Sequence, residues 1–123
     1  MIEDFNTMCI CGSMRFYQLM LRFAEYFTRG GFIVLMPFVN KVDIDKKNDF
    51  DRIALVERLD KMHKVKMKMA DIVLVVTGEI GENYIGDSTQ SEITYAKLNN
   101  KPIVYSNEVL ESLKLSTTIP DAL

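Results

Sequence analysis

Residues 71–77, with the sequence Asp-Ile-Val-Leu-Val-Val-Thr, constrain the fold more than any other stretch of the chain. Five consecutive aliphatic side chains leave no polar face for water, and the β-branched ones favour an extended backbone. Continuous apolar strands of this kind are typical of parallel sheets that are covered by helices on both faces. The stretch therefore predicts a central strand of an α/β domain.

The other apolar segments alternate between strand-like and helix-like patterns. Short apolar runs predict three further strands, at residues 7–11, 32–36 and 102–105. Apolar residues at helical spacing predict helices at residues 16–29, 50–70 and 88–99, and a last short helix from about Glu108. We expect one domain over residues 1–123, of the α/β class, with an open parallel sheet of four to five strands flanked by helices on both faces.

The predicted helix at residues 50–70 is the longest. Four of its apolar residues keep helical spacing and are expected to face the core, namely Leu55, Leu59, Met62 and Met69. Its lysines are expected to face water, namely Lys61, Lys64, Lys66 and Lys68. The polar stretch before it, at residues 40–51, is interpreted as a mobile surface loop.

Composition and charge exclude several classes of function. The formal charge is −2, and 48% of the residues are hydrophobic and 26% charged, as in an ordinary globular protein. The chain has no basic patch for nucleic acid, and no apolar stretch approaches the roughly 20 residues of a membrane span. We therefore expect no nucleic acid polymer and no membrane as a partner.

Cys9 and Cys11 are the only cysteines, and they occupy alternate positions of the first predicted strand. Both side chains should therefore lie on one buried face as small apolar groups. Their spacing, without a second Cys or His cluster, is not a zinc signature, and neither is expected to form a disulfide. Two buried thiols fit a reducing compartment, so we expect a cytoplasmic protein.

The loop Gly12-Ser13-Met14-Arg15 follows the first predicted strand, at the carboxyl edge where ligands bind in such sheets. Its backbone N–H groups, hydroxyl and guanidinium could converge on a phosphate or a sugar hydroxyl. Alternatively, Ser13 caps the next helix and Arg15 is solvated. The loop is neither a dinucleotide fingerprint nor a Walker loop, because it lacks their further glycines and lysine.

Glu92 lies where the loop after the central strand enters a helix. Thr89-Gln-Ser-Glu92 has the pattern of a capping box, in which Thr89 is the N-cap and Glu92 bonds back to its backbone. The helix dipole would also keep the carboxylate ionised there and available as a nucleophile. The position of Glu92 alone slightly favours a role as nucleophile over a role limited to helix capping.

Asp60 and His63 share one face of the helix that leads into the central strand, so they could hydrogen-bond to one another. His63 is the only histidine of the chain, and a structural role is the simpler interpretation. Tyr17 and Tyr84 could stack on a base or pack in the core.

Four segments together resemble the nucleoside 2-deoxyribosyltransferases and the related 2'-deoxynucleoside 5'-monophosphate N-glycosidases. They are CICGSMRF at residues 9–16, LDKMHKVKMKMADIVLVV at 59–76, YIGDSTQSEITYA at 84–96 and NKPIVY at 100–105. The resemblance implies a flavodoxin-like or Rossmann-like three-layer sandwich. It also implies an enzyme that cleaves or transfers the N-glycosidic bond of a 2'-deoxynucleoside or its 5'-monophosphate, without metal or organic cofactor. Members are commonly homodimers or higher homo-oligomers, which we expect here.

The resemblance assigns roles to single residues. Glu92 takes the position of the nucleophile, which forms a covalent glycosyl-enzyme. The family's second acidic position falls on His63, so either Asp60 takes that role from one turn earlier, or His63 takes it and Asp60 orients it. The residues expected to bind substrate are Cys11, Gly12, Ser13, Arg15, Tyr17, Pro37, Gly86, Asp87, Ser88, Ser91 and Asn107.

The preferred substrate and the completeness of the site depend on a few of these residues. Ser13 and Arg15 resemble the phosphate-binding loop of the monophosphate hydrolases, which favours a nucleotide. The family serine six residues before the glutamate is replaced by Gly86, which weakens that preference. Ser106 and Asn107 would complete the site locally or across a subunit interface.

A rival interpretation is a non-catalytic nucleotide-binding or sensing module on the same fold. Glu92 would then cap its helix and bind a ribose hydroxyl. A protein without catalytic activity would also not need an aspartate at the family's second acidic position, which His63 occupies here. A flavin-binding protein is a weaker alternative, because the loop after the first strand lacks a run of Ser and Thr.

Overall fold

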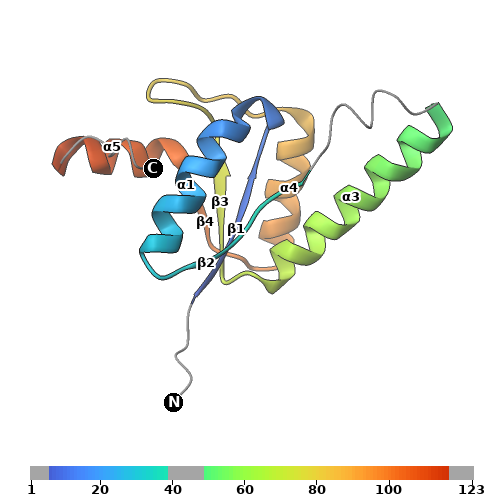
Figure 1. Ribbon diagram of the computed structural model, residues 1–123, viewed down its shortest axis with the longest axis horizontal. Helices are drawn as coiled ribbons and strands as arrows, with labels where there is room; N and C mark the ends of the chain where they lie inside the picture. The colour runs from blue at the N-terminus through green and yellow to red at the C-terminus, as the bar shows by residue number, and fades with distance from the viewer. Residues whose placement is uncertain (1–5, 39–48, 117–123) are drawn as a thin grey trace, which may run out of the picture.

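Strands and helices alternate along the chain in the computed structural model, which describes residues 6–38 and 49–116 (Figure 1). The strands are β1 (Thr7–Gly12), β2 (Ile33–Leu35), β3 (Ile72–Val76) and β4 (Ile103–Tyr105). The helices are a 3-10 turn, η1 (Met14–Phe16), and α1 (Tyr17–Arg29), α3 (Asp49–Met69), α4 (Asp87–Leu98) and α5 (Ser106–Ser116). The predicted strands and helices are all confirmed, with small shifts at their ends.

β1 and β3 are the inner strands of a four-stranded, all-parallel sheet with the order β2-β1-β3-β4. β1 pairs with β3 from Met8 opposite Ile72 to Gly12 opposite Val76. The apolar run at residues 71–77 therefore forms a central strand, as its composition predicts. Among the described residues the sheet has four strands, the lower of the two predicted numbers.

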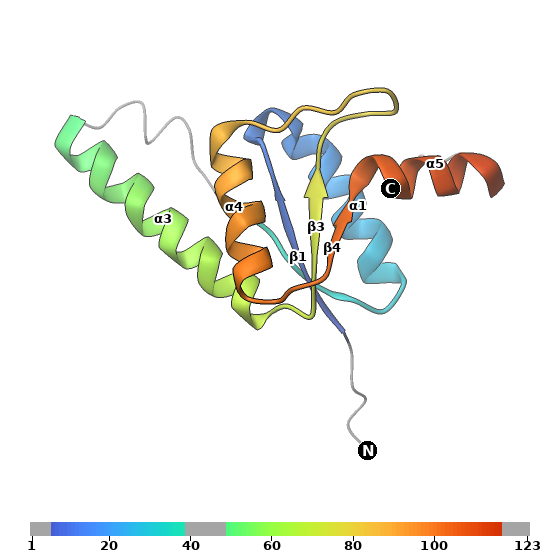
Figure 2. The same ribbon diagram turned by 180° about the vertical axis from the view of Figure 1, so that it is seen from behind.

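Helices cover both faces of the sheet, which gives the predicted three-layer arrangement (Figure 2). α1 and α5 pack on one face, and α3 and α4 cover the other. The side chains of β1 alternate between these two cores. Met8 and Ile10 point to α1 and α5, whereas Cys9 and Cys11 point to α3 and α4. The prediction that both thiols share one buried face is confirmed.

α3 crosses its face of the sheet obliquely, and its N-terminal part extends beyond the sheet (Figures 1 and 2). His63 and Met67 are its buried residues nearest the sheet, one helical turn apart. Met62 and Met69 lie on the other side and are 51% and 65% exposed, so the prediction that they face the core is wrong. Lys66 donates a hydrogen bond of 2.7 Å to the carbonyl of the residue after β2, so it does not simply face water.

The predicted surface loop at residues 40–51 falls largely on residues 39–48, which lie outside the described part of the chain. Its last residues already belong to α3, which begins at Asp49. None of the described helices combines the length and the apolar composition that crossing a membrane requires.

Candidate functional site

A cleft of about 530 Å³ opens beyond the carboxyl ends of β1 and β2. Its walls come from η1, from the segment after β2, from α3 and from the start of α4. Asp60, His63 and Glu92 all line it, although they come from two different helices. The fold therefore brings together the three residues that were predicted to be catalytic.

Glu92 lies in the second turn of α4 and is only 9% exposed. α4 begins at Asp87, with Gly86 as its N-cap and no side-chain capping bond, so Thr89 is an ordinary helical residue. The predicted capping box is therefore wrong. Oε2 of Glu92 has no hydrogen-bond partner among the described residues, so this oxygen does not cap the helix.

Burial raises the pKa of Glu92 above its ordinary value of 4.5, although the charge of His63 and the thiol of Cys11 act in the opposite direction. From the sequence we expected the helix dipole to keep this carboxyl ionised. In the structure the loss of water dominates, and the net shift of the pKa is upward. A poorly solvated carboxylate with an unpartnered oxygen keeps a lone pair available for an electrophile.

His63 is 6% exposed, and its Nε2 atom faces the two thiols of β1. It lies 3.3 Å from Sγ of Cys11 and 3.9 Å from Sγ of Cys9. Asp60 instead pairs with Lys64 at 3.1 Å, and Nδ1 of His63 has no hydrogen-bond partner among the described residues. The predicted hydrogen bond between Asp60 and His63 is therefore not formed.

The thiols and the imidazole shift one another's pKa values. A hydrogen bond from Cys11, helped by His63, lowers the pKa of Cys9 from 9.0 to about 6 in spite of burial. Donating that bond, together with burial, raises the pKa of Cys11 well above 9.0. Burial lowers the pKa of His63, but its contact with Cys9 and the charge of Glu92 together outweigh burial, and the net shift is upward. A thiolate at Cys9 and an imidazolium at His63 therefore stabilise each other.

The loop after β1 shapes one wall of the cleft. Gly12 has a φ of 149°, and a Cβ there would lie 2.6 Å from the carbonyl oxygen of Val76. The hydroxyl of Ser13 accepts a bond of 3.4 Å from the backbone N–H of Arg15 and caps η1, so the predicted capping role of Ser13 is confirmed. The guanidinium of Arg15 lies 3.8 Å from the ring centre of Tyr84, a cation–π contact beside the cleft.

The residues predicted to bind substrate fall into two groups. Those that line the cleft are Gly12, Ser13, Pro37, Gly86, Asp87 and Ser88. Those that do not line it are Cys11, Arg15, Tyr17, Ser91 and Asn107. Cys11 lies against His63, and Tyr17 packs on the core beneath α1. Ser106 is fully buried, and its hydroxyl accepts a 2.8 Å bond from the N–H of Thr77, which is a structural contact.

Sequence analysis missed the apolar wall of the cleft. Phe38, Val56 and Leu59 form part of it, together with the ring of Tyr84. The spacing of Val56 and Leu59 was an available signal, because residues three apart share a helical face and Asp60 lies next to them. An apolar wall opposite a carboxylate suits a ligand with a flat apolar part and a polar part.

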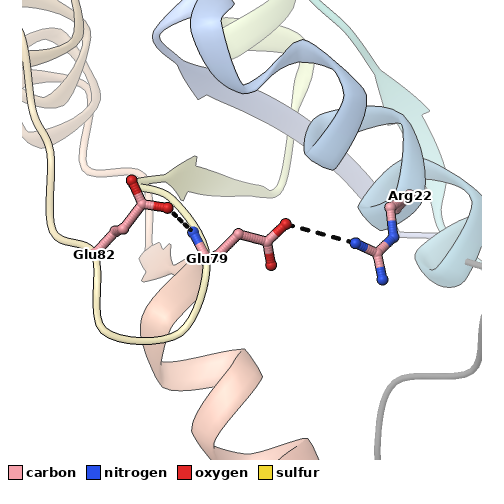
Figure 3. A network of polar contacts seen from close by, with 3 residues as sticks. All are labelled: Arg22, Glu79 and Glu82. Carbon is pink, nitrogen blue, oxygen red and sulfur yellow. Dashed lines mark hydrogen bonds and ion pairs between the residues drawn. The ribbon is translucent and has the colours of Figure 1, made fainter.

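Acidic residues and an arginine fix the loop between β3 and α4, which carries Tyr84 (Figure 3). Oε1 of Glu82 accepts a 3.0 Å hydrogen bond from the backbone N–H of Glu79. Oε1 of Glu79 in turn lies 3.6 Å from Nη1 of Arg22 on α1. The loop is thus tied to the helix on the opposite face of the sheet from α4.

Comparison with known protein families gives no match, and no curated protein matches in sequence. The fold is similar to that of a solved structure, a 2-desoxiribosyltransferase from Leishmania mexicana, with a TM-score of 0.53 and 13% sequence identity. The similarity covers 81% of this chain and 63% of that protein, so this chain spans less than two thirds of its length. At this identity the comparison shows a shared three-layer α/β fold.

Proposed function

We propose that the protein cleaves or transfers the N-glycosidic bond of a 2'-deoxynucleoside or its 5'-monophosphate, with Glu92 as the nucleophile. One observation carries the proposal. Glu92 is a buried carboxylate that lines a cleft and has one oxygen without a hydrogen-bond partner among the described residues. The fold shared with a 2-desoxiribosyltransferase supports the substrate class.

The chemistry follows from a carboxylate in such a place. An oxygen of Glu92 attacks C1' while the bond from C1' to the base nitrogen breaks, which leaves a glycosyl ester on the enzyme and a free base. Water or a nitrogen of a second base then attacks C1' and releases the glutamate. Water gives hydrolysis and a second base gives transfer.

Asp60 and His63 fit two different tasks in this reaction. Asp60 lines the cleft and is partly exposed, so it can meet the sugar hydroxyls or supply the proton that the departing base needs. His63 is held by thiols, and its positive charge lowers the pKa of Glu92 against the effect of burial. We therefore propose that Asp60 acts on the substrate, and that His63 positions Glu92 and favours its ionised form.

The test is chromatography of purified protein incubated with the four deoxynucleosides and their monophosphates, with and without an acceptor base. Glu92→Gln keeps the shape and removes the charge, so base release should fall by at least about 10³-fold. Glu111→Gln, at an exposed position of α5, is the matched control and should keep full activity. Mass spectrometry should also detect a glycosyl adduct on the wild-type chain and none on Glu92→Gln.

Two outcomes would contradict the proposal. Full activity of Glu92→Gln would exclude this residue as the nucleophile. Retained nucleotide binding by a wild-type protein that releases no base would instead support the nucleotide-binding or sensing module.

The monophosphate preference depends on Arg15, which stacks on Tyr84 beside the cleft. A guanidinium there could reach a 5'-phosphate after a small movement. In the same assay Arg15→Ala should therefore weaken the use of the monophosphate more than that of the free nucleoside. An equal loss for both substrates would remove the phosphate from the proposal.

A further inference from the structure

Behind the cleft, two thiols and an imidazole converge on one small volume. Sγ of Cys9, Sγ of Cys11 and a ring nitrogen of His63 all lie within 4.8 Å of one another. Both thiols are fully buried and His63 is 6% exposed. β1 holds the thiols on one face at alternate positions, and α3 places the imidazole over them. The set is therefore fixed by the backbone of two packed elements.

The distances in this cluster are close to those of a tetrahedral metal site. With Zn–S bonds of about 2.3 Å and Zn–N bonds of about 2.0–2.1 Å, tetrahedral coordination separates a sulfur from a nitrogen by about 3.6 Å. Nε2 of His63 lies 3.3 Å from one sulfur and 3.9 Å from the other. The two nitrogen-to-sulfur distances therefore differ from those of a tetrahedral site by only a few tenths of an ångström, and the two sulfurs, which lie within 4.8 Å of each other, would have to lie about 3.8 Å apart.

Glu92 lies beside the cluster and is not part of it. It interacts with the Cys11 thiol, and its Oε2 is buried without a hydrogen-bond partner among the described residues. His63 and Glu92 line the cleft, and the thiols lie behind them, so a cation can enter from the cleft. Two sulfurs and one imidazole are donors that suit a thiophilic cation and not magnesium or calcium.

We propose that Cys9, Cys11 and His63 form a binding site for a thiophilic divalent cation such as Zn²⁺ or Cd²⁺. Binding displaces the thiol protons, and the two thiolates balance the charge of the cation. The inference goes beyond the glycosidic reaction and does not depend on it, since the site is defined by its own donor atoms.

The chain offers a clean test, because it contains two cysteines and one histidine in all. After removal of any affinity tag, the reduced, metal-free protein is titrated with Co²⁺. One equivalent should produce a thiolate-to-cobalt charge-transfer band and the visible bands of a tetrahedral complex. Zn²⁺ should displace the cobalt, and it should raise the melting temperature because it binds the folded state.

Variants assign the ligands. Cys9→Ala, Cys11→Ala and His63→Gln should each weaken Zn²⁺ binding at least about 100-fold, since loss of even an outer-shell partner costs 10–100-fold. Met67→Leu is the matched control, because this fully buried thioether belongs to the same core and its replacement keeps the volume. It should bind as the wild type does. Glu92→Gln should leave the charge-transfer band in place, because Glu92 lies outside the three-residue cluster.

Where a variant fails to fold, X-ray absorption of the zinc-loaded wild type replaces it and should show two sulfur ligands. Absence of the charge-transfer band at one equivalent, an all-oxygen or all-nitrogen zinc shell, or folded Cys→Ala variants with unchanged affinity would overturn the site. Metal binding is read without substrate, so its failure is distinct from a failure to release base.

Discussion

The two faces of the sheet are built from the same strands and differ in chemistry. The core under α1 and α5 is formed by buried hydrocarbon and thioether side chains, namely Met8, Ile10, Leu19, Met20, Phe23, Leu74, Val76 and Leu110. The core under α3 and α4 contains two cysteines and adjoins a buried histidine and a buried glutamate. β1 supplies both cores, since its alternate residues point to opposite faces.

The difference between the two faces suggests that stability and chemistry depend on different sides of the same sheet. Apolar burial on the first face stabilises the fold in proportion to the area removed from water. On the second face, burial raises the free energy of every charged group that it encloses. Among the titratable groups there, Cys9 and His63 stabilise each other's charged forms against this cost. The first face should therefore govern stability and the second should govern chemistry.

The largest effect that separates the faces should come from a truncation on the apolar one. Phe23 is 1% exposed, and Phe23→Ala should lower the free energy of unfolding by about 3–5 kcal/mol. Cys11→Ala on the other face removes only one sulfur and should cost about 1 kcal/mol. Urea denaturation of both variants measures these values. Equal losses would mean that the two faces share the stability evenly.

The second prediction concerns the thiols. Ultraviolet thiolate absorbance of the wild type should show one thiol with a pKa of about 6 and a second that titrates well above 9.0. Cys11→Ala removes the largest cause of the low value, so the pKa of Cys9 should rise towards 9.0. His63→Gln should raise it by less. If His63→Gln raises the pKa of Cys9 more than Cys11→Ala does, the imidazole and not the neighbouring thiol is the main stabiliser of the Cys9 thiolate.

The third prediction is that Glu92→Gln stabilises the protein at neutral pH. Because the folded pKa of Glu92 lies above its ordinary value of 4.5, the native state binds more protons between these two values. The free energy of unfolding therefore falls as pH rises through that window and stays lower above it. Glu92→Gln should melt at a higher temperature than wild type at pH 7, and this gain should vanish below pH 4.5.

Its control is again the exposed glutamate of α5. Glu111→Gln should change the melting temperature at pH 7 much less than Glu92→Gln, because this side chain is exposed in the folded state. A lower melting temperature of Glu92→Gln at pH 7 would mean that the negative charge is a net stabiliser of the second face.

Much of this arrangement could be predicted from the sequence. The aliphatic run of β3 determined a central parallel strand, and the alternate positions of Cys9 and Cys11 determined their common face. The carboxyl-edge rule placed Glu92 in the cleft. These inferences succeeded because each depends on backbone geometry, which the residue pattern records directly.

The contacts of individual side chains were harder to predict. Spacing put Asp60 and His63 on one face, but Lys64 pairs with Asp60, and two thiols 54 and 52 positions away contact His63. Sequence spacing does not say which of several possible partners a side chain chooses. The capping-box pattern at Thr89 failed for a different reason, because α4 begins earlier, after Gly86.

The smallest predicted effect belongs to the ion pair that joins α1 to the loop after β3 (Figure 3). Nη1 of Arg22 lies 3.6 Å from Oε1 of Glu79, and both side chains are well exposed, so water screens the pair. Arg22→Ala should lower the free energy of unfolding by no more than about 0.5 kcal/mol, and added salt should shrink the difference. Because the loop carries Tyr84, base release should be measured with the same variant. A loss of turnover that corresponds to a larger free energy than the loss of stability would show that α1, on the apolar face, affects activity through this loop. Stability and chemistry would then not be divided cleanly between the two faces.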